Sequence, residues 1–189
     1  MIERVEETSP KLIEELIPEN ISMSIIVKVL QNLLSEGVPI KDMRTILETL
    51  SDIAPSTKSP EALTNYVRTK LGRLIVQQVC DPLDTLEVMT LEPNLEQMLT
   101  DLVKSAPNSE DVTLEPNLAQ TLIETLSDEV TSAQESEKPA VLIVSPTIRT
   151  WLSHFIGKLK KDLSVLSYRE VPDDQPIKIL RTIELQERE

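Results

Sequence analysis

Residues 140–144 read AVLIV, and this continuous apolar run decides the fold class of the second half of the chain. A short apolar run without polar alternation is typical of a strand that is covered on both faces. Ser145 and Pro146 follow and predict a helix start, because the first offers a capping hydroxyl and the second suits the first helical position. The expected helix, TIRTWLSHFIGKLKKD, is rich in lysine at residues 158–161, near its negative C-terminal end.

Upstream of this strand, the hexapeptide TLEPNL occurs twice, at residues 90–95 and 113–118. In each copy the proline suits the first helical position, and the glutamate before it places a carboxylate at the positive helix end. Apolar residues at helical spacing follow both copies, so TLEPNL predicts a helix start used twice. The stripes expected to face inward include Met98 after the first copy and Ile123 after the second.

A catalytic interpretation of the repeat would pair Glu92 and Glu115 as general acid and base. No group that would grip a substrate accompanies them, and nothing in the sequence brings them together. We therefore expect no enzyme activity and name no catalytic residue.

Three further segments predict strands: LEVMTL at residues 86–91, SVLSYREV at 164–171 and IKILRTIEL at 177–185. The last two are joined by PDDQP, whose composition suits a turn. In the last strand Ile177 and Ile179 share one face with Ile183 and Leu185. The second half therefore predicts a small α/β sandwich of about four strands and three helices.

The first half predicts helices instead. Residues 22–37, 39–55 and 59–80 carry apolar residues at helical spacing, and the shorter segment PKLIEELIP at residues 10–18 precedes them. Tyr66 belongs to the face of the third helix that is expected to point inward. The whole chain is therefore expected to be α+β, with a helical subdomain over residues 1–80 and an α/β subdomain over residues 81–189.

Composition excludes several classes of function. Only 3 of the 189 residues are glycine, and no glycine-rich loop of the kind that cradles phosphates is present. Cys80 is the single cysteine and His154 the single histidine, so we predict no disulfide, no metal site and no cofactor. No apolar run of the chain approaches the length that crosses a bilayer.

The net charge of −13 is concentrated in the middle of the chain, where residues 81–140 hold 2 Lys/Arg against 14 Asp/Glu. Such a field repels nucleic acid and anionic lipid but leaves basic protein partners open. A helix-turn-helix around Gly37 would offer Lys41 and Arg44 to DNA. Acidic residues of the same segment would repel the DNA phosphates, and we predict no nucleic-acid partner.

Long stretches of the chain resemble the cytoplasmic part of the FlhA/LcrD family, the large export-gate proteins of flagellar and virulence type III secretion. They are KVLQNLLSEGVPIKDMRTILETLSDIAP at residues 28–55, LTNYVRTKLGRLIVQQ at 63–78, LEPNLAQTLIETL at 114–126, PAVLIVSPTIR at 139–149 and LSVLSYREVPDD at 163–174. The resemblance covers nearly the whole chain but only the C-terminal part of the family's length, its last two subdomains.

This resemblance implies a ring-forming scaffold, a nonamer in the full-length protein, that docks export chaperones and substrates and other export-apparatus proteins. It implies a place at the cytoplasmic face of the bacterial inner membrane, reached only through N-terminal spans that this sequence lacks. LGRLIVQQ favours the flagellar branch, and LSYREVPDD also suits the virulence branch. A stand-alone regulatory module that binds proteins is the remaining alternative.

For the ring or partner interface we select the polar side of the second main helix. Its residues are Lys41, Asp42, Arg44 and Glu48. A closed ring needs a head-to-tail interface, and a charged helix face is a suitable part of one. The alternative for the same residues is an ordinary solvated helix face.

Overall fold

The computed structural model describes residues 21–106, 112–157 and 162–184. The chain divides into two compact units, the first ending at Val76 and the second beginning at Gln77. Two predicted features, the short helix at residues 10–18 and the lysine-rich helix end at 158–161, lie outside the described residues.

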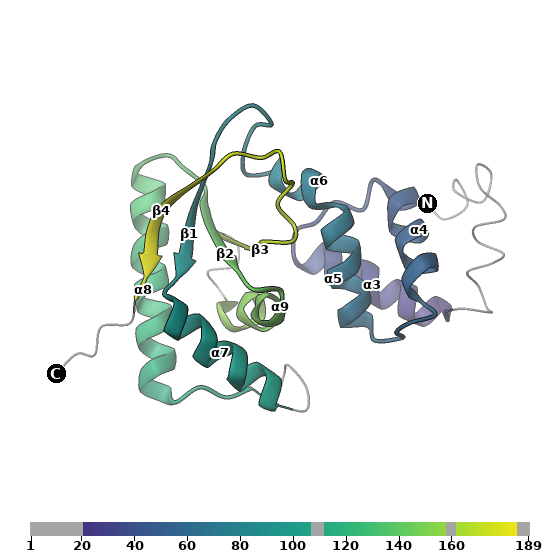
Figure 1. Ribbon diagram of the computed structural model, residues 1–189, viewed down its shortest axis with the longest axis horizontal. Coiled ribbons are helices and arrows are strands. Elements are labelled where there is room, and N and C mark those ends of the chain that lie inside the picture. The colour runs from purple at the N-terminus through teal and green to yellow at the C-terminus, as the bar shows by residue number, and fades with distance from the viewer. Residues whose placement is uncertain (1–20, 107–111, 158–161, 185–189) are drawn as a thin grey trace. The chain divides into compact units, whose positions relative to one another are not determined.

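The described part of the first unit consists of helices. They are α3 (Met23–Ser35), α4 (Met43–Ile53), α5 (Pro60–Lys70) and the short α6 (Gly72–Val76) (Figure 1). Helix α5 packs against both α3 and α4. The core between them is aliphatic, as the scarcity of aromatic residues requires, and includes Ile26, Leu33, Ile46, Leu50 and Leu63.

Local chemistry decides where these helices begin and end. The Asp42 carboxylate caps α4 by accepting from the Thr45 amide at 3.1 Å. The Ser59 hydroxyl caps α5 by accepting from the Ala62 amide at 3.4 Å, and Pro60 takes the first helical position. Gly37, with φ of 73°, supplies the left-handed residue that ends α3.

The third predicted helix is wrong in two respects. It is interrupted at Leu71, so that α5 and α6 replace one continuous helix. Tyr66 does not point inward but is 48% exposed, because Leu63 and Val67 already fill the buried stripe and the phenol stays in water.

The second unit is a parallel sheet with helices. Its strands are β1 (Leu86–Leu91), β2 (Ala140–Val144), β3 (Leu163–Ser167) and β4 (Ile177–Ile183), in the order β3-β2-β1-β4. Its helices are α7 (Pro93–Ser105), α8 (Pro116–Glu135) and α9 (Pro146–Phe155). Over the described residues the chain thus has seven helices and four strands, which confirms the predicted mixed fold.

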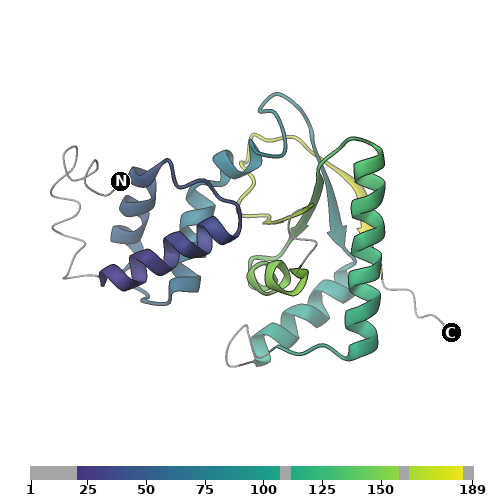
Figure 2. The ribbon, with the colours of Figure 1, turned by 180° about the vertical axis from the view of Figure 1, so that it is seen from behind.

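One face of the sheet carries the main core of this unit. Met89, Leu142 and Val165 lie side by side across β1, β2 and β3, and buried residues of α7, α8 and α9 join them in one cluster. Figure 2 shows these three helices beside the sheet. Trp151 stacks on Phe155 with 5.1 Å between ring centroids. The AVLIV run forms β2, and four of its five residues are buried because the strand lies between β1 and β3.

The last two strands depart from expectation. PDDQP lies in the connection from β3 to β4, which are at opposite edges of the sheet. Because β4 is an edge strand, Ile177 and Ile179 are 49% and 60% exposed. Its pairing with β1 is also interrupted by a register shift, which leaves Leu180 as an extra residue between Ile179 and Arg181.

Candidate interaction surface and charged sites

The predicted interface residues lie at the N-terminal end and along the exposed face of α4. Lys41 and Asp42 precede the helix and are exposed, as are Arg44 and Glu48 within it. Asp42 also accepts from the Thr45 hydroxyl at 2.7 Å, so its carboxylate is committed to the helix start. The buried stripe of the same helix, which includes Met43 and Leu47, holds α4 in the unit and leaves these polar groups outward.

Arg44 and Glu48 form an ion pair one helical turn apart. The Arg44 Nε donates to Glu48 Oε1 at 2.7 Å, and the two side chains are 73% and 47% exposed. The pKa of Arg44 is raised above its usual value, first by this hydrogen bond and then by the Glu48 charge. Both charges of the pair therefore lie on the solvent-facing side of α4.

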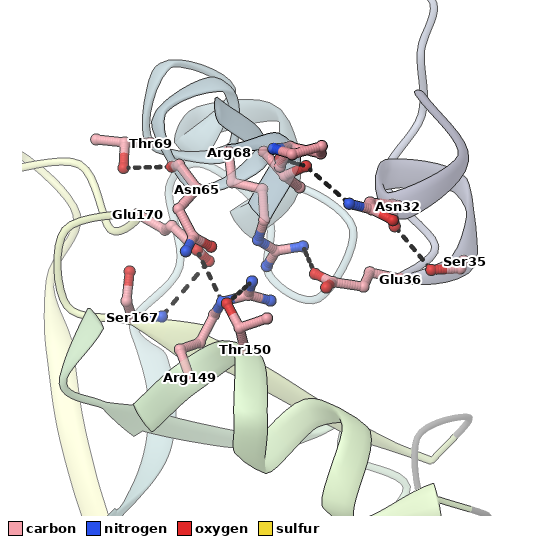
Figure 3. Close-up of polar contacts among 12 residues, drawn as sticks. Asn32, Ser35, Glu36, Asn65, Arg68, Thr69, Arg149, Thr150, Ser167 and Glu170 are labelled. Carbon is pink, nitrogen blue, oxygen red and sulfur yellow. Dashed lines mark hydrogen bonds and ion pairs between the residues drawn. The ribbon is translucent and has the colours of Figure 1, made fainter. Parts of the chain in front are cut away.

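The sequence did not reveal a buried ion pair in the first unit. Arg68 Nη1 donates to Glu36 Oε2 at 2.8 Å, and their side chains are only 3% and 4% exposed (Figure 3). Nearby, Asn32 donates its side-chain amide to the Thr64 hydroxyl at 3.2 Å, joining α3 to α5. The available signal was Arg68 directly after the inward-facing Val67, where an uncompensated charge would be costly.

The second unit contains a comparable pair. Arg149 Nε lies 3.7 Å from Glu170 Oε1, and both side chains are 2% exposed. The Ser167 amide donates to the other Glu170 oxygen at 3.4 Å, and Arg149 donates to the Thr150 hydroxyl at 2.8 Å (Figure 3). Arg149 follows the buried Ile148 in α9, which is the same kind of signal. In each unit the buried arginine thus has a carboxylate partner, without which its buried charge would be costly.

A cleft of about 520 Å³ lies beside the beginnings of β1 and β2, with α8 and β4 contributing to its lining. Glu87 in β1 binds Lys138 and also Lys178, the latter at 2.9 Å, and Arg181 binds Glu129. The hydrogen bond from Lys138, followed by the one from Lys178, lowers the pKa of Glu87. The charges that line the cleft are thus largely paired with one another.

Cys80 lines the same cleft and is half-buried. Burial, and then the charges of Asp84 and Asp81, raise the pKa of its thiol. A thiol in this environment carries less of the reactive thiolate at neutral pH, so the geometry does not favour a nucleophile.

The two glutamates of the repeat occupy helix starts. Glu92 accepts from the Leu95 amide at 2.9 Å at the start of α7, whereas Glu115 makes no side-chain cap at the start of α8. Ser145 likewise makes no side-chain cap at α9, contrary to prediction, and its own amide donates to Glu96. No three His, Cys, Asp or Glu side chains gather as a metal site anywhere in the described residues. In the same part of the chain, no helix has the length and apolarity to cross a membrane.

A family model and curated relatives match almost the whole of this chain. The FHIPEP family model matches residues 1–176. The chain belongs to the FHIPEP family. Flagellar biosynthesis protein FlhA of Buchnera aphidicola from Acyrthosiphon pisum is 40% identical over 183 residues, which are 97% of this chain and 26% of that protein. FlhA of Escherichia coli K12 is 38% identical over 184 residues, with the same two coverages. The resemblance to the FlhA/LcrD family is therefore confirmed.

Several solved structures have the same fold as this chain. The Chlamydia pneumoniae CdsV and CdsO complex contains a chain that matches with a TM-score of 0.86 and 27% identity, over 98% of this chain and 53% of that one. Nonameric EPEC SctV-C matches with a TM-score of 0.83 and 26% identity, over 96% and 54%. The chain spans about a quarter of the length of the curated relatives and about half of the solved chains.

Proposed function

We propose that this chain is the C-terminal cytoplasmic part of a type III protein-export gate of the flagellar branch, and that it contributes a ring-forming scaffold and a docking platform for export chaperones and substrates. The observation that carries the proposal is the 40% identity to a flagellar FlhA over 97% of the chain. The work of such a part is recognition and assembly.

Two solved neighbours support the assembly and partner parts of the proposal. The EPEC neighbour is nonameric, and the Chlamydia neighbour was solved in complex with CdsO. By similarity, we propose that this chain occurs in a homo-oligomeric ring at the cytoplasmic face of the inner membrane and contacts other export-apparatus proteins.

Within that ring we propose the exposed end of α4 as part of the contact between subunits or with a partner. Lys41 lies just before α4, and Arg44 and Glu48 present two charged groups on the helix itself, held together by their 2.7 Å ion pair. Preordered side chains lose less conformational entropy when an interface forms, which favours their use there.

The test introduces charge changes into the full-length gene of the source organism. Arg44→Glu should reduce the ring fraction of the purified cytoplasmic region and reduce motility, because it reverses one charge of the interface and breaks the intrahelical pair. The double variant Arg44→Glu with Glu48→Arg restores a pair inside the helix but exchanges the two charges. It should remain defective if the positions of the charges matter to a partner. Lys70→Glu, another exposed cation of the first unit, is the matched control.

Recovery of ring assembly and motility in the double variant would mean that only the helix itself needed the pair. Normal behaviour of Arg44→Glu would exclude this face from the interface while leaving the export-gate proposal open. Loss of virulence-type secretion with intact motility would instead favour the injectisome branch. The higher identity to flagellar relatives is why we place the chain in the flagellar branch.

A further inference from the structure

Strand β4 forms one edge of the sheet, and no described strand pairs with its outer side (Figure 1). On its inner side the Pro176 and Ile183 carbonyls accept from amides at the two ends of β1, so both carbonyls point inward. Because backbone polar groups alternate in direction along a strand, the N–H and C=O groups of Ile177, Ile179 and Thr182 point outward. A row of such groups is a template for pairing with another extended chain.

The side chains that commonly guard an edge strand are engaged elsewhere in β4. Lys178 Nζ donates to Glu87 Oε1 at 2.9 Å, and Arg181 pairs with Glu129, so carboxylates of the same unit hold both cations. The strand, IKILRTI, contains no proline, which is another residue that protects sheet edges. The register shift at Leu180 interrupts the outward row once. The edge therefore remains able to accept a further strand on either side of that shift.

The two faces of β4 differ in chemistry. Ile177 and Ile179 are 49% and 60% exposed, and Ile179 lies in register beside the buried Val88. Arg181 lies in register beside Met89, which belongs to the core that α8 covers. Since Val88 and Met89 are successive residues of β1, they point to opposite faces. One face of the edge is thus apolar, and the other carries charge next to α8.

A groove of about 420 Å³ lies between α8 and the end of β4. Of the described residues that line it, four carry carboxylates and one carries a guanidinium. The carboxylates are those of Glu124, Asp128, Glu129 and Glu184, and the guanidinium is that of Arg181. Arg181 balances only one of the four negative charges, so the groove suits a cationic side chain of a partner.

We propose that the outer edge of β4 binds an extended segment of another protein, in which apolar residues alternate with lysine or arginine. The segment adds a strand to the sheet. Its apolar side chains lie beside Ile177 and Ile179, and a basic side chain reaches the groove near Asp128. In strand addition the main-chain hydrogen bonds give affinity and the alternate side chains give specificity. This inference goes beyond the proposed export function, because it concerns a different surface and the chemistry of its partner.

Amide hydrogen exchange of the full chain, followed by NMR, tests the proposal. The probe is a short peptide that alternates valine with lysine, and the control peptide has glutamate in place of each lysine. We expect the lysine peptide to slow exchange several-fold at the outward amides of Ile177, Ile179 and Thr182. Lys178 should change little, since its amide faces β1. The glutamate peptide should leave all four amides unchanged, and added salt should weaken the effect of the lysine peptide.

Two variants separate the backbone contribution from the charge contribution. Ile179→Pro removes one outward N–H but no hydrogen bond to β1, and an edge strand tolerates proline at such a position. Asp128→Lys reverses one charge of the groove, and Asp101→Lys, at an exposed residue of α7, is its matched control. Fluorescence anisotropy of the labelled lysine peptide should show several-fold weaker binding to the first two variants and unchanged binding to the control. Circular dichroism shows that each variant remains folded.

The absence of protection by the lysine peptide would overturn the proposal. Equal binding of the two peptides would also overturn it, as would binding that Ile179→Pro and Asp128→Lys leave unchanged. Protection of the outward amides that appears without peptide and grows with protein concentration would overturn it too, and would assign the edge to a second copy of the chain. None of these results bears on the test at Arg44, so this proposal and the proposed function fail separately.

Discussion

The two copies of TLEPNL have the same six residues and each begins a helix at its proline, yet only the first uses its glutamate as a helix cap. Glu92 and Glu115 have nearly equal dihedrals, φ −60° and ψ 138° against φ −55° and ψ 136°, and a proline follows each at the first helical position. Glu92 nevertheless accepts from the Leu95 amide and from the Asn94 side chain, both at 2.9 Å. Glu115 caps no amide.

The surroundings of the copies explain the difference. Thr90 and Leu91 end β1, and the Glu92 amide donates to the Ile183 carbonyl of β4 at 2.9 Å. The first copy is therefore hydrogen-bonded to the sheet, whereas the second copy follows a connection between two helices. The local sequence decides where each helix begins, and the tertiary neighbours decide whether the carboxylate is held in place.

The largest loss of stability is expected at positions where the two copies are equally buried. Leu99 and Leu122 occupy equivalent positions after each copy, and both are fully buried. Leu99→Ala and Leu122→Ala should each lower the free energy of unfolding by about 2–5 kcal/mol, since each removes buried contacts and leaves a cavity. Urea unfolding followed by fluorescence of Trp151 measures this, because that residue is the single tryptophan and lies in the same core. A large loss of stability in only one of the two variants would show that the equivalent leucines do not contribute equally to the core.

A smaller loss of stability should differ between the two copies. Leu95 is 6% exposed, whereas Leu118 is only partly buried against the same core. We expect Leu95→Ala to cost about 2–3 kcal/mol and Leu118→Ala about 1 kcal/mol, in proportion to the apolar surface that each buries. The same urea experiment compares them, and equal losses would contradict the difference in burial.

Periodicity predicted the element types well because each helix and strand carries its own pattern of apolar residues. AVLIV indicated a central strand, and both TLEPNL copies indicated helix starts, since those signals are local. The exposure of Met98 and Ile123, at 39% and 37%, was not predicted. These residues lie at the margins of apolar stripes, and only the packed structure shows how wide the buried part is.

Features that depend on distant parts of the chain could not be predicted from the sequence either. The pairing of β4 with β1 joins residues about ninety positions apart, and no local signal states which strands become edges. The burial of Arg68 and Arg149 depends on Glu36 and Glu170, which lie far from them in the sequence. Within the candidate interface, the sequence predicted exposure correctly, but whether a partner uses that surface stays a prediction.

The cap itself should contribute less than the leucines. Glu92→Ala should lower the free energy of unfolding by about 1 kcal/mol because it removes the hydrogen bond to the Leu95 amide. Glu115→Ala should cost only a few tenths of a kcal/mol, since it removes a negative charge near a helix N-terminus but no cap bond, and it serves as the matched control. Repeating both at high salt should shrink the Glu115 effect more, because the charge interaction is screened. A Glu92 effect no larger than that of Glu115 would mean that the cap bond is not maintained in solution.

The smallest effect concerns the asparagines of the two copies. Asn94 donates to Glu92 Oε1 and so helps to orient the carboxylate that caps α7. Asn94→Ala should cost a few tenths of a kcal/mol more than Asn117→Ala, since both changes alter helix propensity at the same position but only the first removes this bond. A double-mutant cycle isolates the term, because in a Glu92→Ala background the Asn94→Ala effect should fall to that of Asn117→Ala. If it does not fall, Asn94 acts on the helix start independently of the glutamate, and the difference between the copies cannot be assigned to the capping bond.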